Sequence, residues 1–474
     1  MKQRSITYKS VPVKNVSLRF LKNTTGRSTI HVGIDIGKHK LYVSVRWTLP
    51  RSKAVVHEHP WFVENTREIP ELVTKLRKIT SQNKLVVGIE STGSYGDPLR
   101  QALADAGIVV HQVRTKVTHD YAEVFDGVPS QHDGKDAAVI AELVSQGKST
   151  PWPFETQSET ENEMRYQVKK MIDIHEDIER QQGKLEGLLA RYWPEITSIL
   201  ALTSMTLLKL LRYYGGPGPL HVDKESPQKI RQFSCGRIHE EKSNEIRNAA
   251  KQTCGVRQGA WDLQTCKDIT VHMLELYKQS HACKKRLKAL IEQSCEPLQR
   301  LSKILGIGTA SVVWCRIGDP RRYHCSDAWI KAMGLNLVER SSGEYQSEYH
   351  ISKRGDSETR RWLYMSALRW VQQSPVKQWY QRKKLQTGKK IPGEDNKRTG
   401  GKAVVAVMRK LMKGLWYALV HDKPFDPEKL FFKEGSRRKD VTPGKRPRQK
   451  KTKKARCLGS VKVGFLRNGQ KSTK

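Results

Sequence analysis

The sequence predicts an α/β domain followed by a mainly helical region. Between residue 32 and about residue 145, short apolar segments of strand length alternate with segments of helical spacing. Beyond that point, two long and highly charged segments carry apolar residues at helical spacing. The sequence after about residue 298 is again helical in its pattern, which places the only sheet of any size in the first third of the chain.

Strands are expected at 32–36, at 41–47, near 54–63, at 84–90 and at 108–113. Helices are expected at 67–80, at 97–107 and from about residue 133. An initial hairpin followed by alternating strands and helices is typical of a mixed sheet with helices packed on it. These residues therefore predict a mixed α/β sheet with its own core.

The two long charged segments, 158–195 and 261–300, predict an antiparallel coiled hairpin. The sequence between them, 200–258, contains a Gly/Pro break and further short helices, and its periodicity is too weak to indicate a role. A second compact unit begins at about residue 298, with helical segments on either side of a polar stretch.

Both ends of the chain are basic. Residues 1–27 carry seven basic and no acidic side chains, and residues 433–474 carry 16 Lys and Arg against two Asp and Glu. We expect five parts, which in chain order are a flexible basic arm (1–27), an α/β domain (28–155), a helical coiled-coil linker with an insert (156–297), a second domain (298–432) and a disordered basic tail (433–474).

The charge of the whole chain indicates the class of partner. With 86 Lys and Arg against 48 Asp and Glu, the 474 residues carry a formal net charge of +38. A field of this sign attracts polyanions, so nucleic acid is the first partner to consider and an anionic membrane surface is the competitor. The chain has no apolar run of membrane-spanning length and no secretory signal, so we expect a soluble, cytoplasmic protein. The eight cysteines lack paired spacing, which does not favour a zinc site.

Four acidic residues are candidates for a metal site. Asp35 lies inside the first strand, Glu90 ends the strand "LVVGIE", and Asp133 and Asp136 lie three apart at the start of a helix. Carboxylates brought close together repel one another unless a cation or a proton lies between them. An oxygen-rich pocket of this kind suits Mg²⁺ or Mn²⁺, and such ions assist phosphoryl transfer on nucleic acid.

Each acid also has a purely structural interpretation. Asp133 could cap the helix with Asp136 in its first turn, and Glu90 could accept backbone hydrogen bonds in the turn that follows. Asp35 is the hardest to explain structurally, because an unpaired carboxylate inside a strand is costly. An acid and a glycine before a hairpin also occur in sugar-kinase and actin-like ATPases, but the second phosphate loop of those proteins is missing here.

Six motifs occur in an order that resembles a known family. They are "GIDIGKHK", "GIESTGSYGDPL", "HDGKDAAVIAEL", "LGIGTASVVWCRIGD", "AMGLNLVERSSG" and "HISKRGDSETRRWLYMSAL". The set resembles the DEDD transposases of bacterial and archaeal insertion sequences, in the family numbered one hundred and ten, which includes the Piv-type invertases. The resemblance covers residues 30–145 and 298–426.

The resemblance implies a RuvC-like domain of ribonuclease H fold, a coiled-coil linker and a C-terminal transposase domain with a serine nucleophile. By position, Asp35, Glu90, Asp133 and Asp136 would bind metal, and Ser342 of "ERSSG" would be the nucleophile, with Ser341 as its competitor. The implied activity is cleavage and rejoining of DNA through a covalent serine-phosphate intermediate. Some members are directed by a structured bridge RNA, and joining two DNA ends implies a homo-oligomer, a dimer or a tetramer, associated with the nucleoid.

Several further residues are candidates for contact with nucleic acid. Lys353, Arg354, Arg360 and Arg361 could contact phosphates, or could simply be solvated. "LGIG", with Gly306 and Gly308, resembles the turn of a helix-hairpin-helix unit, whose N–H groups meet phosphates; a tight turn between packed helices is the equal alternative. This chain departs from the family pattern at two places, because Gln131 stands where Lys or Arg is usual and Leu305 where proline is.

Two other functions remain open at this stage. A RuvC-like, metal-dependent junction nuclease would hydrolyse DNA with water and leave no covalent adduct. A catalytically inactive scaffold would bind nucleic acid without cutting it, although four intact carboxylates argue against a decayed site. The extensions at both ends have no counterpart in the resemblance.

Overall fold

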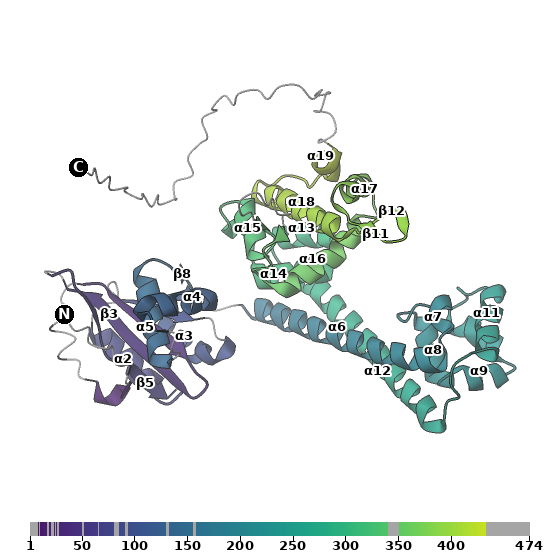
Figure 1. Ribbon diagram of the computed structural model, residues 1–474, viewed down its shortest axis with the longest axis horizontal. Helices are drawn as coiled ribbons and strands as arrows, with labels where there is room; N and C mark the ends of the chain where they lie inside the picture. Colours follow the sequence, from purple (N-terminus) through teal and green to yellow (C-terminus); the bar gives the residue numbers. More distant parts are fainter. Residues whose placement is uncertain are drawn as a thin grey trace, which may run out of the picture. The chain divides into compact units, whose positions relative to one another are not determined.

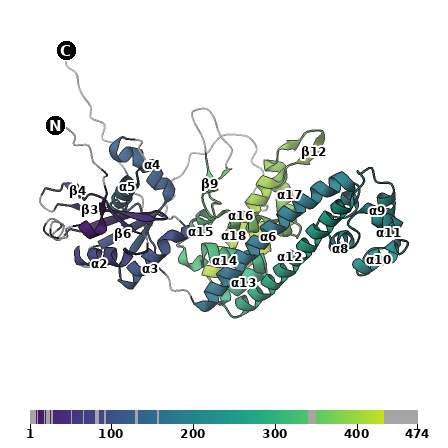
Figure 2. The same ribbon diagram turned by 90° about the horizontal axis from the view of Figure 1, so that it is seen from below.

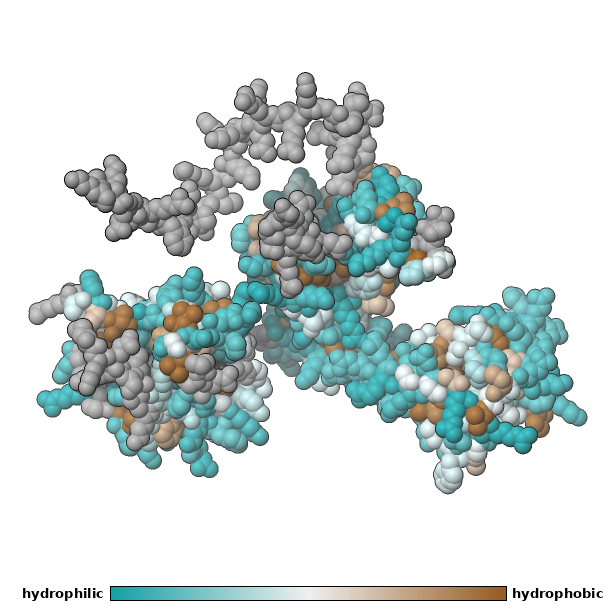
Figure 3. Space-filling model, viewed as in Figure 1, coloured by the Kyte–Doolittle hydropathy of each residue, from teal (hydrophilic) through white to brown (hydrophobic). Residues whose placement is uncertain are grey.

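The chain divides into two compact units. The computed structural model describes residues 8, 10–16, 19, 23, 25, 28–49, 52–64, 66–79, 85–90, 93–128, 132–154, 158–339 and 350–432, except the side chains of 394–397. The first unit is Met1–Ser158 and the second is Glu159–Lys474 (Figure 1). The surface seen in Figure 3 is mostly hydrophilic in both units, with separate hydrophobic patches.

The first unit contains a mixed sheet with the strand order β1-β5-β3-β2-β6-β7-β8, and β4 pairs with β3 beside this path. β2 runs parallel to β6 and antiparallel to β3, and β6 runs parallel to β7. The strands are β1 (Val11–Pro12), β2 (Ile30–Ile36), β3 (Lys40–Thr48), β4 (Val55–His57), β5 (Trp61–Glu64), β6 (Leu85–Glu90), β7 (Val110–Val113) and β8 (Thr150–Pro151). The expected mixed α/β sheet is present.

Helices cover both faces of this sheet. Leu72 and Leu76 of α2 pack with Leu99 and Leu103 of α3 in the same core as Val32 and the other alternate apolar residues of β2. On the opposite face, α5 packs against β2, β3 and β6 and shares a smaller core with α4. The helices of this unit are η1 (Val13–Asn15), α2 (Ile69–Ile79), η3 (Gly93–Gly96), α3 (Asp97–Asp105), α4 (Thr115–Asp126) and α5 (Asp133–Ser145).

Three details of this unit differ from the expectation. The expected third strand is divided into β4 and β5, with residues 58–60 between them, and helix α4 was not expected at all. Part of the basic arm belongs to the sheet: β1 pairs with β5, and the Val13 side chain is fully buried in the core. The Lys75 ammonium donates a hydrogen bond to the Val13 carbonyl, which fastens this segment to α2.

Two long antiparallel helices form the framework on which the rest of the second unit packs. These helices, α6 (Glu159–Tyr192) and α12 (Ala260–Glu292), lie side by side in Figure 2. Their direction follows from the contacts: Arg286 Nη2 donates to Glu163 Oε2 at 2.6 Å near one end, and Tyr192 Oη donates to Asp262 Oδ1 at 2.8 Å near the other. The apolar residues of both helices are buried at helical spacing, as the sequence predicted.

The polypeptide between α6 and α12 folds into a small helical cluster with its own core. Its helices are α7 (Ile196–Ile199), α8 (Met205–Tyr214), α9 (Pro217–Val222), α10 (Ser226–Phe233) and α11 (Glu240–Lys251). The Gly/Pro break is the turn between α8 and α9, where Gly215 takes a left-handed φ of 78° and Pro217 begins the next helix.

The rest of the second unit packs around the opposite end of the two long helices, in a core that includes Met164 and Met171 of α6. Its helices are α13 (Glu296–Leu305), α14 (Ile307–Ile317), η4 (Pro320–Arg322), α15 (Ser326–Ala332), α16 (Ser357–Trp370), α17 (Val376–Thr387), α18 (Gly401–Val420) and α19 (Pro427–Phe432). Two short hairpins complete it: β9 (Leu337–Val338) with β10 (His350–Ile351), and β11 (Lys390–Ile391) with β12 (Glu394–Arg398). Among the described residues, none of the helices is both long and apolar enough to cross a membrane.

Candidate active site

Asp35 and Glu90 lie at the same level on two neighbouring parallel strands, β2 and β6. β2 and β6 pair in register, with Gly33 opposite Gly88 and Ile34 opposite Ile89, and the two acids come next on their strands. Side chains alternate along a strand, so Asp35 and Glu90 share the sheet face of the two glycines. That face is covered by α5.

The glycines let α5 approach the sheet closely. A Cβ atom on Gly33 would lie 2.0 Å from the carbonyl oxygen of Ala137, and one on Gly88 would lie 2.2 Å from Cγ2 of Val144. Neither position therefore tolerates a side chain without movement of the helix or of its side chains. The repeated motif, "VGID" in β2 and "VGIE" in β6, signals this contact in the sequence, and it was not recognised there.

The other two acids lie in the first turn of α5. The imidazole of His132 caps this helix, accepting a hydrogen bond from the Gly134 N–H to Nδ1 at 3.1 Å. Asp133 is thus the first helical residue and not the cap, which corrects the capping interpretation of this residue. Acidic side chains in a first turn are stabilised by the helix dipole, so this placement alone has a structural explanation.

The pKa values show that the four carboxylates affect one another. Burial, followed by the charges of Asp136, Asp133 and Glu90, raises the pKa of Asp35 to about 7. The pKa of Asp136 is raised by burial and then by the charges of Glu90 and Asp133. Two strands and one helix therefore bring the four acids into a single electrostatic cluster, and their role as metal ligands stays a prediction.

Tyr42 belongs to the same cluster. It lies opposite Asp35 in the β2/β3 ladder, and its side chain is close enough to Asp133 for the two groups to interact. Burial and then the charge of Asp133 raise the pKa of Tyr42. The sequence alone does not indicate this residue, because only the strand register places it beside the acids.

The donor set suits a hard divalent cation, which would relieve the repulsion between the carboxylates. Within the part of the chain that the structure describes, however, no three His, Cys, Asp or Glu side chains are already grouped tightly enough to hold a metal ion. Binding would have to draw the carboxylates of this cluster together.

A buried ion pair anchors the start of α5. Lys135 lies between the two acids of that turn in sequence, yet its side chain is fully buried, with Nζ 2.7 Å from Oδ1 of Asp126 at the end of α4. Tyr8 of the arm donates a hydrogen bond to the other oxygen of Asp126 at 2.9 Å. Burial raises the pKa of Asp126. Several hydrogen bonds, of which the one from Lys135 has the largest effect, outweigh burial and lower this pKa below its usual value. This contact fixes the turn that carries Asp133 and Asp136.

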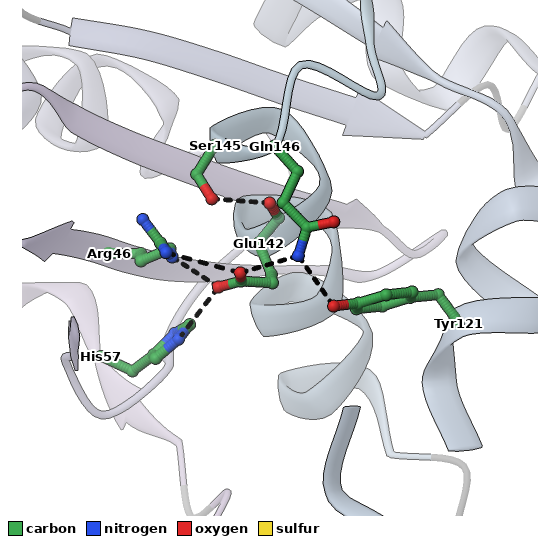
Figure 4. Close-up of polar contacts among 6 residues, drawn as sticks. All are labelled: Arg46, His57, Tyr121, Glu142, Ser145 and Gln146. Atoms are coloured by element: carbon green, nitrogen blue, oxygen red, sulfur yellow. Dashed lines mark hydrogen bonds and ion pairs between the residues drawn. The ribbon is translucent and has the colours of Figure 1, made fainter. Parts of the chain in front are cut away.

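A second polar cluster fixes the other end of α5 (Figure 4). Arg46 of β3 donates from Nε to Glu142 Oε2 at 2.5 Å, and His57 Nε2 lies 3.6 Å from the same oxygen. Gln146 donates to Glu142 at 2.9 Å and to the hydroxyl of Tyr121 at 2.8 Å. The cluster joins α5 to β3, β4 and α4, so we assign it a structural role.

In the second unit, hydrogen bonds from α16 fix the turn at Gly306. The carbonyl of Leu305 accepts hydrogen bonds from Ser366 Oγ at 3.1 Å and from Arg369 Nη2 at 2.8 Å, and Gly306 has a φ of 84°. A Cβ atom on Gly308 would lie 2.8 Å from the Trp362 ring. Both glycines are thus explained by packing, and contact with phosphate remains a prediction for them.

The four predicted basic residues differ in their surroundings. Arg360 donates from Nη1 to the carbonyls of Met333, Gly355 and Asp356, at 2.8–3.2 Å. Arg361 forms ion pairs with Glu179 and, at 3.6 Å, with Glu358. Lys353 and Arg354 are exposed and make no ion pair with any described side chain. These last two therefore remain the better candidates for phosphate contact.

Ser341, Ser342 and Gln131 lie outside the described residues. The described strands on either side of the serine segment, β9 and β10, pair with each other, with Val338 opposite His350. The two ends of that segment are therefore close together.

Comparison with known proteins gives two family matches. Residues 32–194 match the family model DEDD_Tnp_IS110, described as a transposase, and residues 298–382 match the model described as "Transposase IS116/IS110/IS902 family". The chain belongs to the IS110 family of transposases.

Two individual proteins are also similar to this IS110 transposase. The "Insertion element IS110 uncharacterized 43.6 kDa protein" of Streptomyces coelicolor is 21% identical over 370 residues, which cover 76% of this chain and 88% of that protein. The structure of T. thermophilus RuvC in complex with a Holliday junction substrate covers 26% of this chain and 99% of that chain, with 14% identity and a TM-score of 0.20.

The IS110 matches divide the candidate residues into two groups. The first match contains Asp35, Glu90, Asp133 and Asp136, and the second contains Ser342 and the four basic candidates. Neither match includes residues 195–297, where the cluster α7–α11 lies. The family assignment therefore covers both candidate catalytic regions but not this insert.

Proposed function

We propose that this IS110 transposase cleaves and rejoins the DNA strands of an insertion sequence through a covalent serine-phosphate intermediate on Ser342. Mg²⁺ or Mn²⁺ held by Asp35, Glu90, Asp133 and Asp136 assists the reaction. The observation that carries the proposal is the cluster of four mutually repelling carboxylates within the region that matches the DEDD transposase model. A divalent cation bound there would supply charge stabilisation for the reacting phosphate.

The serine step conserves the energy of the DNA backbone. Attack by the Ser342 oxygen forms a bond to phosphorus and breaks the bond to one deoxyribose oxygen, which leaves as a hydroxyl after taking up a proton. The serine proton is lost in the same step. Because a phosphoester is kept throughout, attack by a new DNA hydroxyl on the serine phosphate restores the backbone without ATP.

The covalent intermediate gives the first test. Supercoiled plasmid carrying the ends of the element is incubated with wild-type protein, with Ser342→Ala and with Ser341→Ala, and protein–DNA adducts are trapped by denaturation. We expect adducts from wild type and Ser341→Ala, and none from Ser342→Ala. An adduct that persists in Ser342→Ala and disappears in Ser341→Ala would move the nucleophile to Ser341.

The acidic cluster gives the second test. Asp35→Asn removes one charge with little change of shape, so we expect cleavage to be abolished while DNA retention stays within about twofold of wild type, because phosphate contacts dominate non-specific affinity. Exposed Asp105→Asn on α3 is the matched control, and it should cleave normally. Cleavage by Asp35→Asn at the wild-type rate would exclude a central role for this carboxylate.

We further propose that a structured guide RNA and a homo-oligomer, a dimer or a tetramer, take part, and that the protein acts at the nucleoid. The guide RNA is tested by sequencing RNA that copurifies with the protein from cells carrying the whole element. One discrete species transcribed beside the gene is the expected result, and a random sample of cellular RNA would contradict it. The mass of the complex on DNA ends, measured by light scattering, gives the number of subunits.

A metal-dependent junction nuclease is the second candidate function, and it rests on the same acidic cluster. It would hydrolyse DNA with water, so products would carry free ends and no protein at any time point. The adduct assay therefore separates the two functions directly.

A further inference from the structure

A further candidate site lies on the surface of α17. An open pocket of about 470 Å³ lies there, lined by Gln378, Gln381, Arg382 and Leu385 of α17 and by Phe432 at the end of α19. The four helical residues lie at positions i, i+3, i+4 and i+7, so they form one stripe on one face of α17. The pocket is within the usual size range for small-ligand sites.

Two of the lining residues are apolar and exposed. Leu385 is 63% exposed and Phe432 is 47% exposed. The ring of the preceding residue, Phe431, is buried and packs edge-on against Trp379 with ring centroids 5.4 Å apart, which fixes α19 against α17. Phe432 therefore follows a residue that is packed in the core, and about half of its own surface is exposed.

The surroundings of the pocket are strongly basic. Residues 376–402, which comprise α17, the hairpin β11–β12 and the start of α18, carry nine Lys and Arg against two Asp and Glu, a net charge of +7. The lining itself contains no acidic side chain. Of the basic residues next to the pocket, Lys377, Arg382 and Lys384 have no ion pair with a described side chain. Such a surface attracts a polyanion.

We propose that this pocket binds an unpaired nucleotide of single-stranded nucleic acid. The Phe432 ring offers a face for base stacking, and the amides of Gln378 and Gln381 can both donate and accept hydrogen bonds at a base edge. Arg382 supplies a charge for the neighbouring phosphate, and the lysines of α17 and β11 extend the contact along the backbone.

Charge complementarity favours this occupant over two others. The chain's own segment beyond Phe432 has 16 Lys and Arg against two Asp and Glu, so it would be repelled by the basic surface. An acidic peptide would satisfy the lysines, but it would leave the exposed aromatic ring and the glutamine pair without a matching partner. A nucleotide satisfies all three features at once.

The proposal rests on the family's action on nucleic acid and on neither the metal nor the serine chemistry. The test is therefore a binding experiment on the full chain, in which cleavage plays no part. Fluorescence anisotropy at several salt concentrations compares one labelled sequence as single-stranded DNA, as single-stranded RNA and as duplex DNA. Poly-glutamate serves as the competitor that represents an acidic peptide.

Substitutions at Phe432 separate stacking from general hydrophobic contact. Because stacking of a base on an aromatic ring contributes about 1–3 kcal/mol, Phe432→Leu should weaken single-strand binding by about 5- to 160-fold. Phe432→Tyr keeps the stacking surface and should stay within about twofold of wild type. Duplex binding should change little in either variant, and DNA against RNA identifies the preferred strand.

Arg382→Gln should weaken single-strand binding and make the slope of log affinity against log salt shallower by about 0.7, the value for one phosphate contact. Arg237→Gln, an exposed arginine after α10, is the matched loss of charge and should leave affinity within about twofold of wild type. Photocrosslinking with 5-iodouracil strands should label peptides from α17 or α19.

Three results would each overturn the proposal. One is equal single-strand affinity for Phe432→Leu, Phe432→Tyr and wild type. A second is an effect of Arg237→Gln as large as that of Arg382→Gln, which would reduce the surface to general charge. The third is displacement by poly-glutamate as effective as by an unlabelled oligonucleotide of equal charge.

Discussion

Gly33 of β2 lies directly beneath Ala137 of α5, so close that a Cβ atom on the glycine would be 2.0 Å from the alanine carbonyl oxygen. This contact sets the height of α5 above the sheet. The height in turn decides whether Asp133, one turn earlier on the helix, and Asp136, the residue before Ala137, can interact with Asp35, two residues along the strand. The geometry of the acidic cluster therefore depends on a residue that has no side chain.

Substitution of Gly33 should disturb both stability and the acidic cluster. Gly33→Ala forces α5 away from the sheet, and overpacking of this kind costs about 1–3 kcal/mol of unfolding free energy. Gly183→Ala is the matched control: this glycine lies on the exposed face of α6 with open space around it, and the change should stabilise the protein by about 0.5–1 kcal/mol. Urea unfolding of the two variants measures the difference, and equal midpoints would contradict the close-approach argument.

The ion pair between Lys135 and Asp126 should be much more important than a surface pair. Lys135→Met leaves Asp126 without its main partner in a largely buried position, and breaking a buried pair costs about 3–5 kcal/mol. Lys116→Met removes an exposed pair with Asp120 and should cost at most about 1 kcal/mol. Urea unfolding compares both, and the double variant Lys135→Met with Asp126→Leu should recover part of the loss.

The cluster around Glu142 should make the first unit sensitive to acid. Burial, with a contribution from the positive charge of Arg46, lowers the pKa of His31 and of His57, although Glu142 opposes the shift. The unfolded chain therefore binds more protons than the folded chain below the ordinary histidine pKa of about 6.5. This contribution to stability is complete above that pH and is lost as the pH falls from there toward the folded pKa values.

Replacement of His57 isolates this effect. His57→Gln cannot gain a charge, so its unfolding free energy should fall less steeply between pH 6.5 and 5 than that of wild type. His119→Gln is the control, because His119 is exposed on α4, and its profile should follow wild type. Parallel profiles for wild type and His57→Gln would show that this histidine does not sense pH.

The sequence was sufficient to name the four acids as candidates, but it did not indicate the contacts that hold them in place. Their spacing was sufficient to place Asp133 and Asp136 on one helical face, and the apolar segments were sufficient to place Asp35 inside one strand and Glu90 at the end of another. The pairing of Arg46 with Glu142 joins residues 96 positions apart, and the pattern of neither segment indicates it. Helix α4 was not predicted, although Val117, Tyr121 and Phe125 are spaced four apart and pack against the core of α5, because these residues are only partly buried and the rest of the segment is mostly polar.

Binding of a divalent cation should stabilise the wild-type chain in a way that requires no catalysis. A ligand that binds only the folded state at 100 times its dissociation constant adds about 2.7 kcal/mol to the unfolding free energy. Mg²⁺ or Mn²⁺ should therefore raise the urea midpoint of wild type, while Asp35→Asn should respond little, because it loses a central ligand of the cluster. Asp105→Asn should respond as wild type does, and Na⁺ at equal ionic strength corrects for screening of surface charges. The cation would relieve repulsion among the carboxylates. Without metal at pH 8, Asp35→Asn should therefore be more stable than wild type. A lower stability of this variant would mean that Asp35 is held by contacts other than those with the three acids.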